Sequence, residues 1–278
     1  MDILEYTPKL PEMGYTNKIL WVNLGKESSA EIQDVTEKMR MLYQGGRGYA
    51  IKLLYDHTDE TTDPMGPENL LIISRGPMTG EYRWPGGTKT VISALSPTTN
   101  GYGEASVGGA AGQHMKFSGF DTLCVKGELE SPKILVVDGI NGKIQLEEDP
   151  GTEDALQLGQ DLIEKYGRDV TGVYTLGIAG RKQVRFACIN GIAFNGKYFI
   201  PRQAGRTGMG TVMGKKGLIA VVFIGKVDKH TKVSDRDALM QAGRAMRKVI
   251  AKNDKQQLDM FTKGTSGLVE LEIGRAHV

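Results

Sequence analysis

Two glycine-rich segments, far apart in the sequence, carry the residue types that bind phosphate. Residues 84–89 and 96–109 form the first, and residues 201–210 form the second. Glycine lets backbone N–H groups approach an anion closely, and a neighbouring Lys or Arg neutralises its charge. Together the two segments predict a ligand that carries more than one phosphate.

The familiar phosphate-binding motifs fit these segments only in part. Residues 210–216 are one residue too short for a Walker A loop, with Lys where Ser or Thr should hold magnesium. Residues 208–214 have the wrong last spacing for a dinucleotide fingerprint, and no βαβ unit frames residues 101–103. With 37 glycines in the chain, turns and bulges explain either segment alone. The two together, each beside Lys or Arg, favour phosphate binding.

Composition excludes several classes of protein. The 278 residues are 40% hydrophobic and 24% charged, as in globular proteins, and the net charge of +2 does not favour nucleic acid or an acidic membrane surface. The longest apolar run, residues 218–224, is too short to span a membrane. Cys124 and Cys188 lie in apolar runs, which predicts buried thiols without a disulfide and a cytoplasmic protein. The four histidines show no zinc-ligand spacing, and His114 is expected to be structural.

Strands must position most of these residues. The sequence predicts a hairpin over residues 134–146 and a polar linker over 226–232. Strands are expected at residues 19–24, 70–74, 90–93, 122–125, 134–137, 143–146, 173–176, 184–187 and 218–222. Helices are expected at residues 28–41, 49–55, 152–166 and 234–252. We therefore expect an α+β fold, strand-rich to about residue 228, and the start of an incomplete helical domain over residues 229–271.

Eight motifs in this order resemble one known family. They are Gly-Gly-Arg-Gly-Tyr-Ala at 45–50, Pro-Glu-Asn-Leu-Leu-Ile at 67–72, Gly-Pro-Met-Thr-Gly at 76–80, Ser-Pro at 96–97, Gly-Gly at 108–109, Met-Lys-Phe-Ser-Gly-Phe-Asp at 115–121, Ala-Gly-Arg-Thr-Gly-Met-Gly at 204–210 and Val-Met-Gly at 212–214. With them, the chain resembles the N-terminal domain of the aldehyde ferredoxin oxidoreductase family, tungsten enzymes with a bis-pyranopterin cofactor. Residues 1–228 are expected to form this domain.

The resemblance implies a base of two β-sheets on which two pterins rest. Pterin dithiolenes would hold the tungsten (or molybdenum), and a magnesium ion would bridge the two pterin phosphates through backbone carbonyls. Carried over by motif, the cofactor-binding residues are Lys89, Ser106, Gly108, Arg202, Gln203, Gly205 and Arg206. Ser106 and Gln203 would supply the carbonyls for magnesium. Lys89 stands where the family usually has Arg, which keeps the charge but loses the bidentate fork.

The resemblance also implies an iron–sulfur cluster and an electron-transfer partner. Its members bind a [4Fe–4S] cluster through a Cys-x-x-Cys-x-x-x-Cys run that is absent here. The full enzyme is expected to oxidise an aldehyde to a carboxylic acid and to pass electrons to ferredoxin or an electron-transfer subunit, as a homo- or hetero-oligomer. Residues 272–278 stop resembling the family, and we expect them to be an adapter-derived tail, with the natural protein continuing beyond about Leu271.

Two other functions stay open at this point. The first is the dearomatising reduction of an aryl-CoA, a reaction of relatives of the family. The second is a non-catalytic module that stores or delivers a pterin. A catalytic residue is not identified, because no Ser–His–Asp arrangement or paired-carboxylate motif stands out.

Overall fold

The computed structural model describes residues 2–257, 259–267 and 269, and it divides the chain into two compact units. The first unit comprises residues 1–81 and 88–233, and the second comprises residues 82–87 and 234–278. The assignment of residues 1–228 to a pterin-binding domain and of residues 229–271 to the start of a helical domain stays a prediction. The expected adapter tail, residues 272–278, lies outside the described residues.

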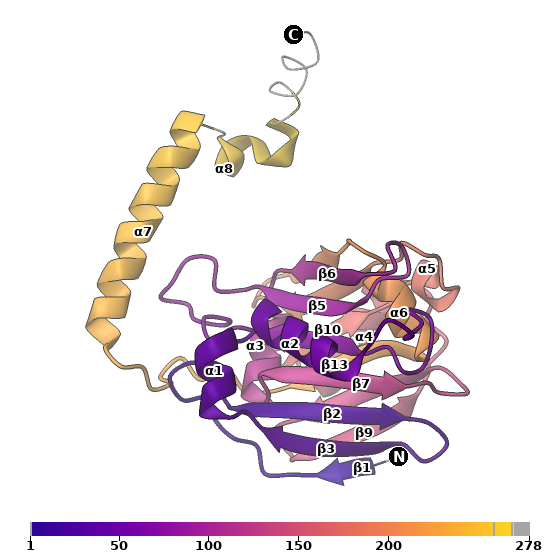
Figure 1. The fold of residues 1–278 in the computed structure, drawn as a ribbon. Coiled ribbons are helices and arrows are strands. Elements are labelled where there is room, and N and C mark those ends of the chain that lie inside the picture. The colour runs from indigo at the N-terminus through magenta and orange to yellow at the C-terminus, as the bar shows by residue number, and fades with distance from the viewer. Residues whose placement is uncertain (1, 258, 268, 270–278) are drawn as a thin grey trace. The chain divides into compact units, whose positions relative to one another are not determined.

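Two β-sheets form the first unit (Figure 1). The larger has the strand order β1-β9-β8-β13-β10-β11-β12, and the smaller has the order β3-β2-β7-β4-β5-β6. Both are mixed, since β8 pairs with β13 and β2 with β7 in parallel. The larger sheet contains β1 (Asp2–Glu5), β8 (Lys133–Asp138), β9 (Lys143–Glu148), β10 (Thr171–Thr175), β11 (Ile189–Phe194), β12 (Phe199–Ala204) and β13 (Leu218–Ile224). The smaller contains β2 (Lys18–Leu24), β3 (Ser29–Asp34), β4 (Leu71–Arg75), β5 (Thr90–Leu95), β6 (Tyr102–Val107) and β7 (Thr122–Gly127).

The main core lies between the two sheets. Strand β13 is apolar and buried at every position. Leu218, Val221 and Phe223 belong to the main core, whereas Ile219 and Val222 belong to a second cluster under a helix. Both faces of β13 are therefore covered. The two sheets also adjoin along their edge strands, β1 beside β3 and β6 beside β12. The second of these junctions positions the candidate site.

Helices cover both outer faces of this sheet pair. Helix α4 (Ala155–Tyr166) packs Leu158, Leu162 and Ile163 on the larger sheet. Helix α2 (Arg47–His57) packs on the smaller sheet, which it covers together with α1 (Glu37–Tyr43) in Figure 1. The remaining helices of this unit are α3 (Ala111–Phe117), α5 (Ile178–Arg181) and α6 (Met209–Lys215). Helices α3 and α6 contribute Met115, Met209 and Met213 to the main core.

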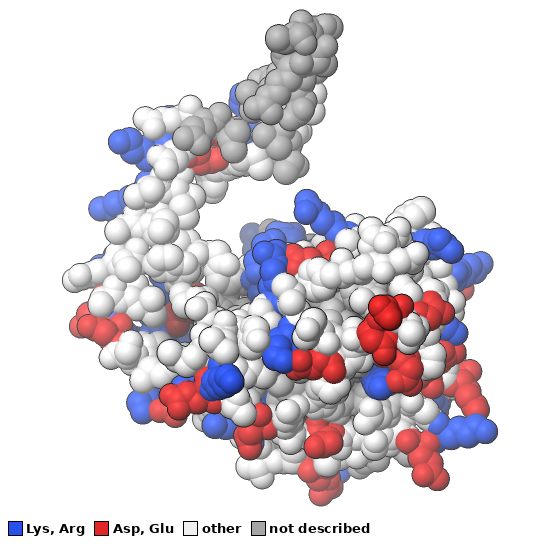
Figure 2. Space-filling view, in the orientation of Figure 1, with Lys and Arg blue, Asp and Glu red and all other residues white. Residues whose placement is uncertain are grey.

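The part of the second unit that follows residue 235 is mainly helical over its described residues, whereas residues 82–87 form turns. Helix α7 (Arg236–Gln257) begins where the Asp235 carboxylate accepts the backbone N–H of Ala238 at 2.8 Å. Helix α8 (Met260–Lys263) and a 3₁₀ turn (Gly264–Gly267) follow. No helix in residues 2–257, 259–267 or 269 is long and apolar enough to cross a membrane. Acidic and basic side chains are intermixed on the surface in view in Figure 2.

The prediction of an α+β fold with two β-sheets is confirmed. The predicted helix over residues 28–41 is wrong in its first half, because Ser29–Asp34 forms the edge strand β3 along β2. Ala30 and Ile32 alternate with more exposed neighbours in this strand, the period of a half-buried strand, and they pack against the main core. The helix begins only at Glu37, after Thr36, whose hydroxyl accepts the N–H of Met39.

The predicted strand over residues 184–187 is also wrong. Val184 and Ala187 instead close a turn, with the Ala187 N–H donating to the Val184 carbonyl at 2.9 Å, and Phe186 is 76% exposed. The strands and helices expected from the sequence leave out residues 96–109 and 201–210, but these residues contain strand β6, most of strand β12 and the start of helix α6. Cys124 is buried as expected, whereas Cys188 is only half-buried, and both are free thiols.

Candidate functional site

A pocket of about 530 Å³ lies in the first unit, where the edge strands β6 and β12 adjoin. Side chains from both glycine-rich segments line it, together with one from helix α2. The lining residues are Arg47, Lys89, Glu104, Ser106, Gln203, Gly205 and Arg206. Residues far apart in the sequence therefore meet in one polar hollow.

Specific contacts hold the two segments together. The Thr207 hydroxyl donates to the Glu104 carbonyl at 3.1 Å, and the Ser96 hydroxyl donates to the Thr207 carbonyl at 2.8 Å. At Gly103 an added Cβ would lie 2.8 Å from the Ser96 Cβ and 3.1 Å from the Thr207 Cβ. A side chain at Gly103 would push the segments apart, so this glycine serves packing between β6 and the turn after β12.

Five of the seven predicted cofactor-binding residues line the pocket. They are Lys89, Ser106, Gln203, Gly205 and Arg206, and all five are exposed. The other two lie beside it: an added Cβ at Gly108 would be 3.8 Å from the Lys89 Nζ, and one at Gly109 would be 3.4 Å from the Arg202 Cγ. Arg202 donates from Nη1 to the Pro201 carbonyl at 2.9 Å. The roles of these seven residues stay a prediction.

Positive charge predominates in the pocket. Its lining contains three cations, Arg47, Lys89 and Arg206, and one carboxylate, Glu104. The hydrogen bond from Arg47 lowers the pKa of Glu104 most, Tyr102 and the charge of Arg206 lower it further, and partial burial opposes them. Glu104 is therefore ionised at neutral pH. Within the described residues, neither Lys89 nor Arg206 forms an ion pair, so two cations are available to an anionic ligand.

The sequence reading missed Arg47 and Glu104 as pocket residues. Arg47 lies in the Gly-Gly-Arg-Gly-Tyr-Ala motif at residues 45–50, which supports the family resemblance, but the resemblance assigns it no role in binding. Glu104 lies two residues before Ser106, and residues i and i+2 of a strand share a face. A strand predicted over residues 102–107 would have placed the side chains of Glu104 and Ser106 on one face.

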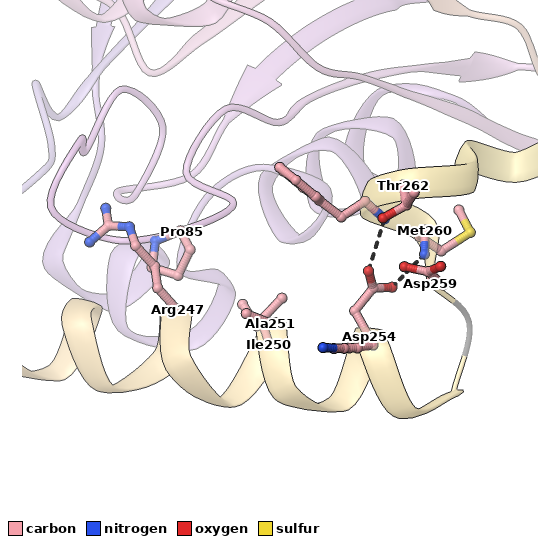
Figure 3. A pocket seen from close by; sticks show the side chains of 10 residues that line it. Pro85, Arg247, Ile250, Ala251, Asp254, Asp259, Met260 and Thr262 are labelled. Carbon is pink, nitrogen blue, oxygen red and sulfur yellow. Dashed lines mark hydrogen bonds between the residues drawn. The ribbon is translucent and has the colours of Figure 1, made fainter.

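A larger pocket, of about 990 Å³, lies within the second unit and is mainly apolar (Figure 3). Its Asp254 carboxylate accepts the backbone N–H groups of Met260 at 2.9 Å and Phe261 at 2.8 Å, and so caps the turn into α8. Its Arg247 donates to the Tyr82 carbonyl at 2.8 Å. Asp254 and Arg247 of this pocket thus bond to nearby backbone atoms, whereas Lys89 and Arg206 of the smaller pocket form no ion pair in the described part of the chain. We therefore assign the candidate site to the smaller pocket.

One further side chain, His114, has a structural role. His114 is buried and its Nδ1 lies 3.0 Å from the Gly225 carbonyl, while burial lowers its pKa. No three His, Cys, Asp or Glu side chains gather as a metal-ligand cluster in the part of the chain that the structure describes.

Comparison with known proteins identifies the family. The profile of the aldehyde ferredoxin oxidoreductase N-terminal domain matches residues 19–225. The tungsten-containing aldehyde ferredoxin oxidoreductase of Pyrococcus horikoshii is 32% identical over 93% of this chain and 41% of its own length. The WOR-like subunit of an aliphatic sulfonate oxidoreductase from Pyrococcus furiosus is 29% identical over 76% of this chain and 34% of its own length.

A solved structure shows the same fold. The active-site complex BamBC of benzoyl-coenzyme A reductase, in complex with 1,5-dienoyl-CoA, matches 89% of this chain and 36% of its own chain, with a TM-score of 0.77 and 26% identity. The chain thus spans between 34% and 41% of the length of these three proteins. From the profile match and these relatives, the chain belongs to the aldehyde ferredoxin oxidoreductase family and contains its N-terminal domain.

Proposed function

We propose that this chain is the cofactor-binding N-terminal part of a tungsten (or molybdenum) pterin oxidoreductase, and that the pocket between β6 and β12 binds the cofactor phosphates. The observation that carries the proposal is the meeting of Lys89 and Arg206, from opposite glycine-rich segments, in one pocket. Tungsten-containing relatives support the cofactor class.

The junction of the two sheets suits a phosphate-bearing cofactor. An edge strand leaves alternate backbone N–H and C=O groups without a partner in its own sheet. Strands β6 and β12 are both edge strands, and no backbone hydrogen bond joins them within the described residues. Unpaired backbone groups and unpaired cations therefore occur together, as phosphate and magnesium binding require.

Each predicted residue has a role in this proposal. Lys89, Arg202 and Arg206 would neutralise phosphates, and Gly108 and Gly205 would allow close approach of the backbone. An added Cβ at Gly205 would meet nothing within 4 Å, so the space beside it is open. The backbone carbonyls of Ser106 and Gln203 would hold a magnesium ion between two pterin phosphates. The bound metal–pterin would supply the two-electron redox chemistry.

The reaction of the whole protein is proposed from its relatives. The simplest is oxidation of an aldehyde to a carboxylic acid, with electrons passed through a [4Fe–4S] cluster to ferredoxin or an electron-transfer subunit in the cytoplasm. The cluster's ligands are absent from this chain. A second candidate is reduction of an aryl-CoA, which the likeness to the benzoyl-coenzyme A reductase complex favours.

Cofactor binding can be tested on the chain itself. After expression in a host that makes the tungsten pterin and is supplied with tungstate, we expect the purified chain to carry metal and pterin, measured by mass spectrometry of the metal and fluorescence of the oxidised pterin. Lys89→Ala and Arg206→Ala should lower both contents together. Lys26→Ala, at an exposed lysine paired with Glu130, is the control. Equal metal and pterin content in all four proteins would reject the site.

A test of the reaction requires the sequence of the source gene. Reading the DNA beyond codon 271 should reveal an open frame that leads to Cys-x-x-Cys-x-x-x-Cys. The encoded protein can then be assayed with a viologen dye for aldehyde oxidation and for aryl-CoA reduction. Turnover of aldehydes alone would support the first candidate, and turnover of an aryl-CoA alone would support the second. A natural stop codon after Val278 would favour a non-catalytic pterin-binding module.

A further inference from the structure

Arg47 is the third cation of the pocket, and it lies outside both glycine-rich segments. It is the first residue of helix α2, after Gly45 and Gly46, whose φ angles of 106° and 54° turn the chain into the helix. The Gly46 N–H donates to the Arg75 carbonyl at 2.9 Å, which ties this turn to strand β4. The pocket therefore receives one cation from a rigid helix start as well as those from its two glycine-rich segments.

Glu104 fixes the orientation of the Arg47 guanidinium. Arg47 Nε donates to Glu104 Oε2 at 2.6 Å, and Nη2 donates to Oε1, so the pair is bidentate. Tyr102 holds the same carboxylate with a hydrogen bond of 2.8 Å to Oε2. The Arg47 side chain is 63% exposed, whereas that of Glu104 is only 22% exposed. A half-buried carboxylate thus anchors an arginine whose other edge is open to solvent.

The anchored arginine keeps donors for a ligand. A guanidinium has five N–H donors, and the Glu104 carboxylate uses two of them. No other acceptor contacts Arg47 in the described part of the chain. The three remaining N–H groups, two of them on Nη1, can therefore bind an anion without breaking the pair with Glu104. A fixed guanidinium also loses less conformational entropy when it binds.

We infer that Arg47 is a further phosphate-binding residue of this pocket and that Glu104 is its positioning residue. The inference rests on the proposed function of the pocket as a phosphate site. A carboxylate in a phosphate-binding pocket lowers the pocket's positive charge. Glu104 offsets this by holding the Arg47 guanidinium in an orientation that can bind phosphate.

Binding of inorganic pyrophosphate to the 278-residue chain, measured by calorimetry at low ionic strength, tests the inference. Arg47→Ala should weaken binding roughly tenfold, as expected for the loss of a charge-assisted hydrogen bond. Arg47→Lys should have an affinity between those of the wild-type chain and Arg47→Ala, because lysine keeps the positive charge but lacks the forked guanidinium. Arg168→Ala is the matched control, since Arg168 forms a similar bidentate pair with Glu164 outside the pocket and should leave binding unchanged.

A double-mutant cycle isolates the role of Glu104. If Glu104 orients Arg47, then Arg47→Ala should cost much less affinity in a Glu104→Gln background than in the wild-type chain. Equal losses in the two backgrounds would overturn the positioning role. Thermal unfolding of each variant shows whether the fold is kept, and a variant that only destabilises the fold would not show this coupling.

The same titrations separate this inference from the proposed function. If Lys89→Ala and Arg206→Ala weaken binding but Arg47→Ala does not, the inference fails and the pocket assignment stands. If the wild-type chain does not bind pyrophosphate, or if the Lys89 and Arg206 variants bind it equally well, the pocket assignment fails and the inference falls with it.

Discussion

Arg75 and Asp121 form an ion pair that is almost completely buried, and its geometry shows how single residues hold the first unit together. Asp121 accepts hydrogen bonds from Arg75 Nη2, from the Thr16 N–H and hydroxyl, and from the Asn17 N–H. Arg75 also donates from Nε to the Phe120 carbonyl at 3.1 Å and from Nη1 to the Gly14 carbonyl at 2.9 Å. The pair therefore fastens the N-terminal segment to strands β4 and β7.

Removal of one partner should be costly. We expect Asp121→Ala to lower the free energy of unfolding by about 3–5 kcal/mol, because it leaves a buried guanidinium without its counter-charge. Urea denaturation of the chain measures this. Asp34→Ala is the control, because Asp34 pairs with Lys18 at 2.6 Å but its side chain is 78% exposed, and it should cause no measurable change. A similar loss in both variants would contradict the expected effect of burial.

Lys216 is a buried lysine of the first unit. Its side chain is 1% exposed, and Nζ donates to the Pro67 and Gly127 carbonyls at 3.3 Å each. Burial lowers the pKa of Lys216 to about 8, and Glu128 and Glu68 oppose this only in part. The unfolded chain therefore binds more protons than the folded chain between pH 8 and the ordinary lysine pKa of 10.5.

Because the unfolded chain binds more protons in this range, the stability contributed by this site rises with pH. Lys216 should destabilise the fold fully below pH 8, by up to roughly 3 kcal/mol, and the penalty should fade as the pH rises toward 10.5. Lys216→Met should therefore be more stable than the wild-type chain at pH 7, with a difference that shrinks at pH 9 and 10. Urea denaturation of both proteins at each pH gives the difference, and a constant or growing difference would refute the prediction.

At the scale of elements, helix α3 approaches strand β10 so closely that only glycine fits between them. An added Cβ at Gly172 would lie 2.6 Å from the Ala111 Cα and 3.0 Å from the His114 Cδ2. The first of these atoms is backbone, so the helix itself would have to move. The contact matters to the site because α3 directly follows strand β6 and the glycines at its end.

We expect Gly172→Ala to destabilise the first unit by about 1–3 kcal/mol through overpacking. Gly25→Ala is a matched control, because an added Cβ there meets nothing within 4 Å and the backbone is not in the left-handed region. Thermal unfolding should separate the two variants clearly. Equal midpoints would show that α3 shifts without cost and that its approach to β10 does not restrict the fold.

At the scale of the whole molecule, the second unit exposes apolar side chains that lie together. Ile250 and Phe261 line the apolar pocket, with exposures of 49% and 98%, and Val249, next to Ile250 in the sequence, is 51% exposed. Contiguous exposed apolar surface favours association. We expect the chain to sediment as concentration-dependent oligomers, and Ile250→Lys with Phe261→Lys to shift it toward monomer. A monomeric wild-type chain with one cooperative unfolding transition would contradict this.

Features that depend on local pattern could be predicted from the sequence alone. The apolar runs at residues 122–125 and 218–222 predicted strands correctly, because buried strands need apolar side chains on both faces. The linker before α7 and the hairpin of β8 and β9 were likewise readable from local residues. The family was recognisable from ordered motifs, since glycines and charges at fixed spacings are legible without coordinates.

Which distant segments meet depends on the three-dimensional fold and could not be predicted from the sequence. Residues 29–34 read as a helix, yet pairing along β2 makes them a strand, because the partner's hydrogen bonds outweigh weak local preference. The junction of β6 with β12, and the arrival of Arg47 beside Glu104, depend on sheet order and edge position. No local pattern encodes such pairings over long separations, so the sequence could propose phosphate-binding residues, but only the fold brought five of them into one pocket and added Arg47.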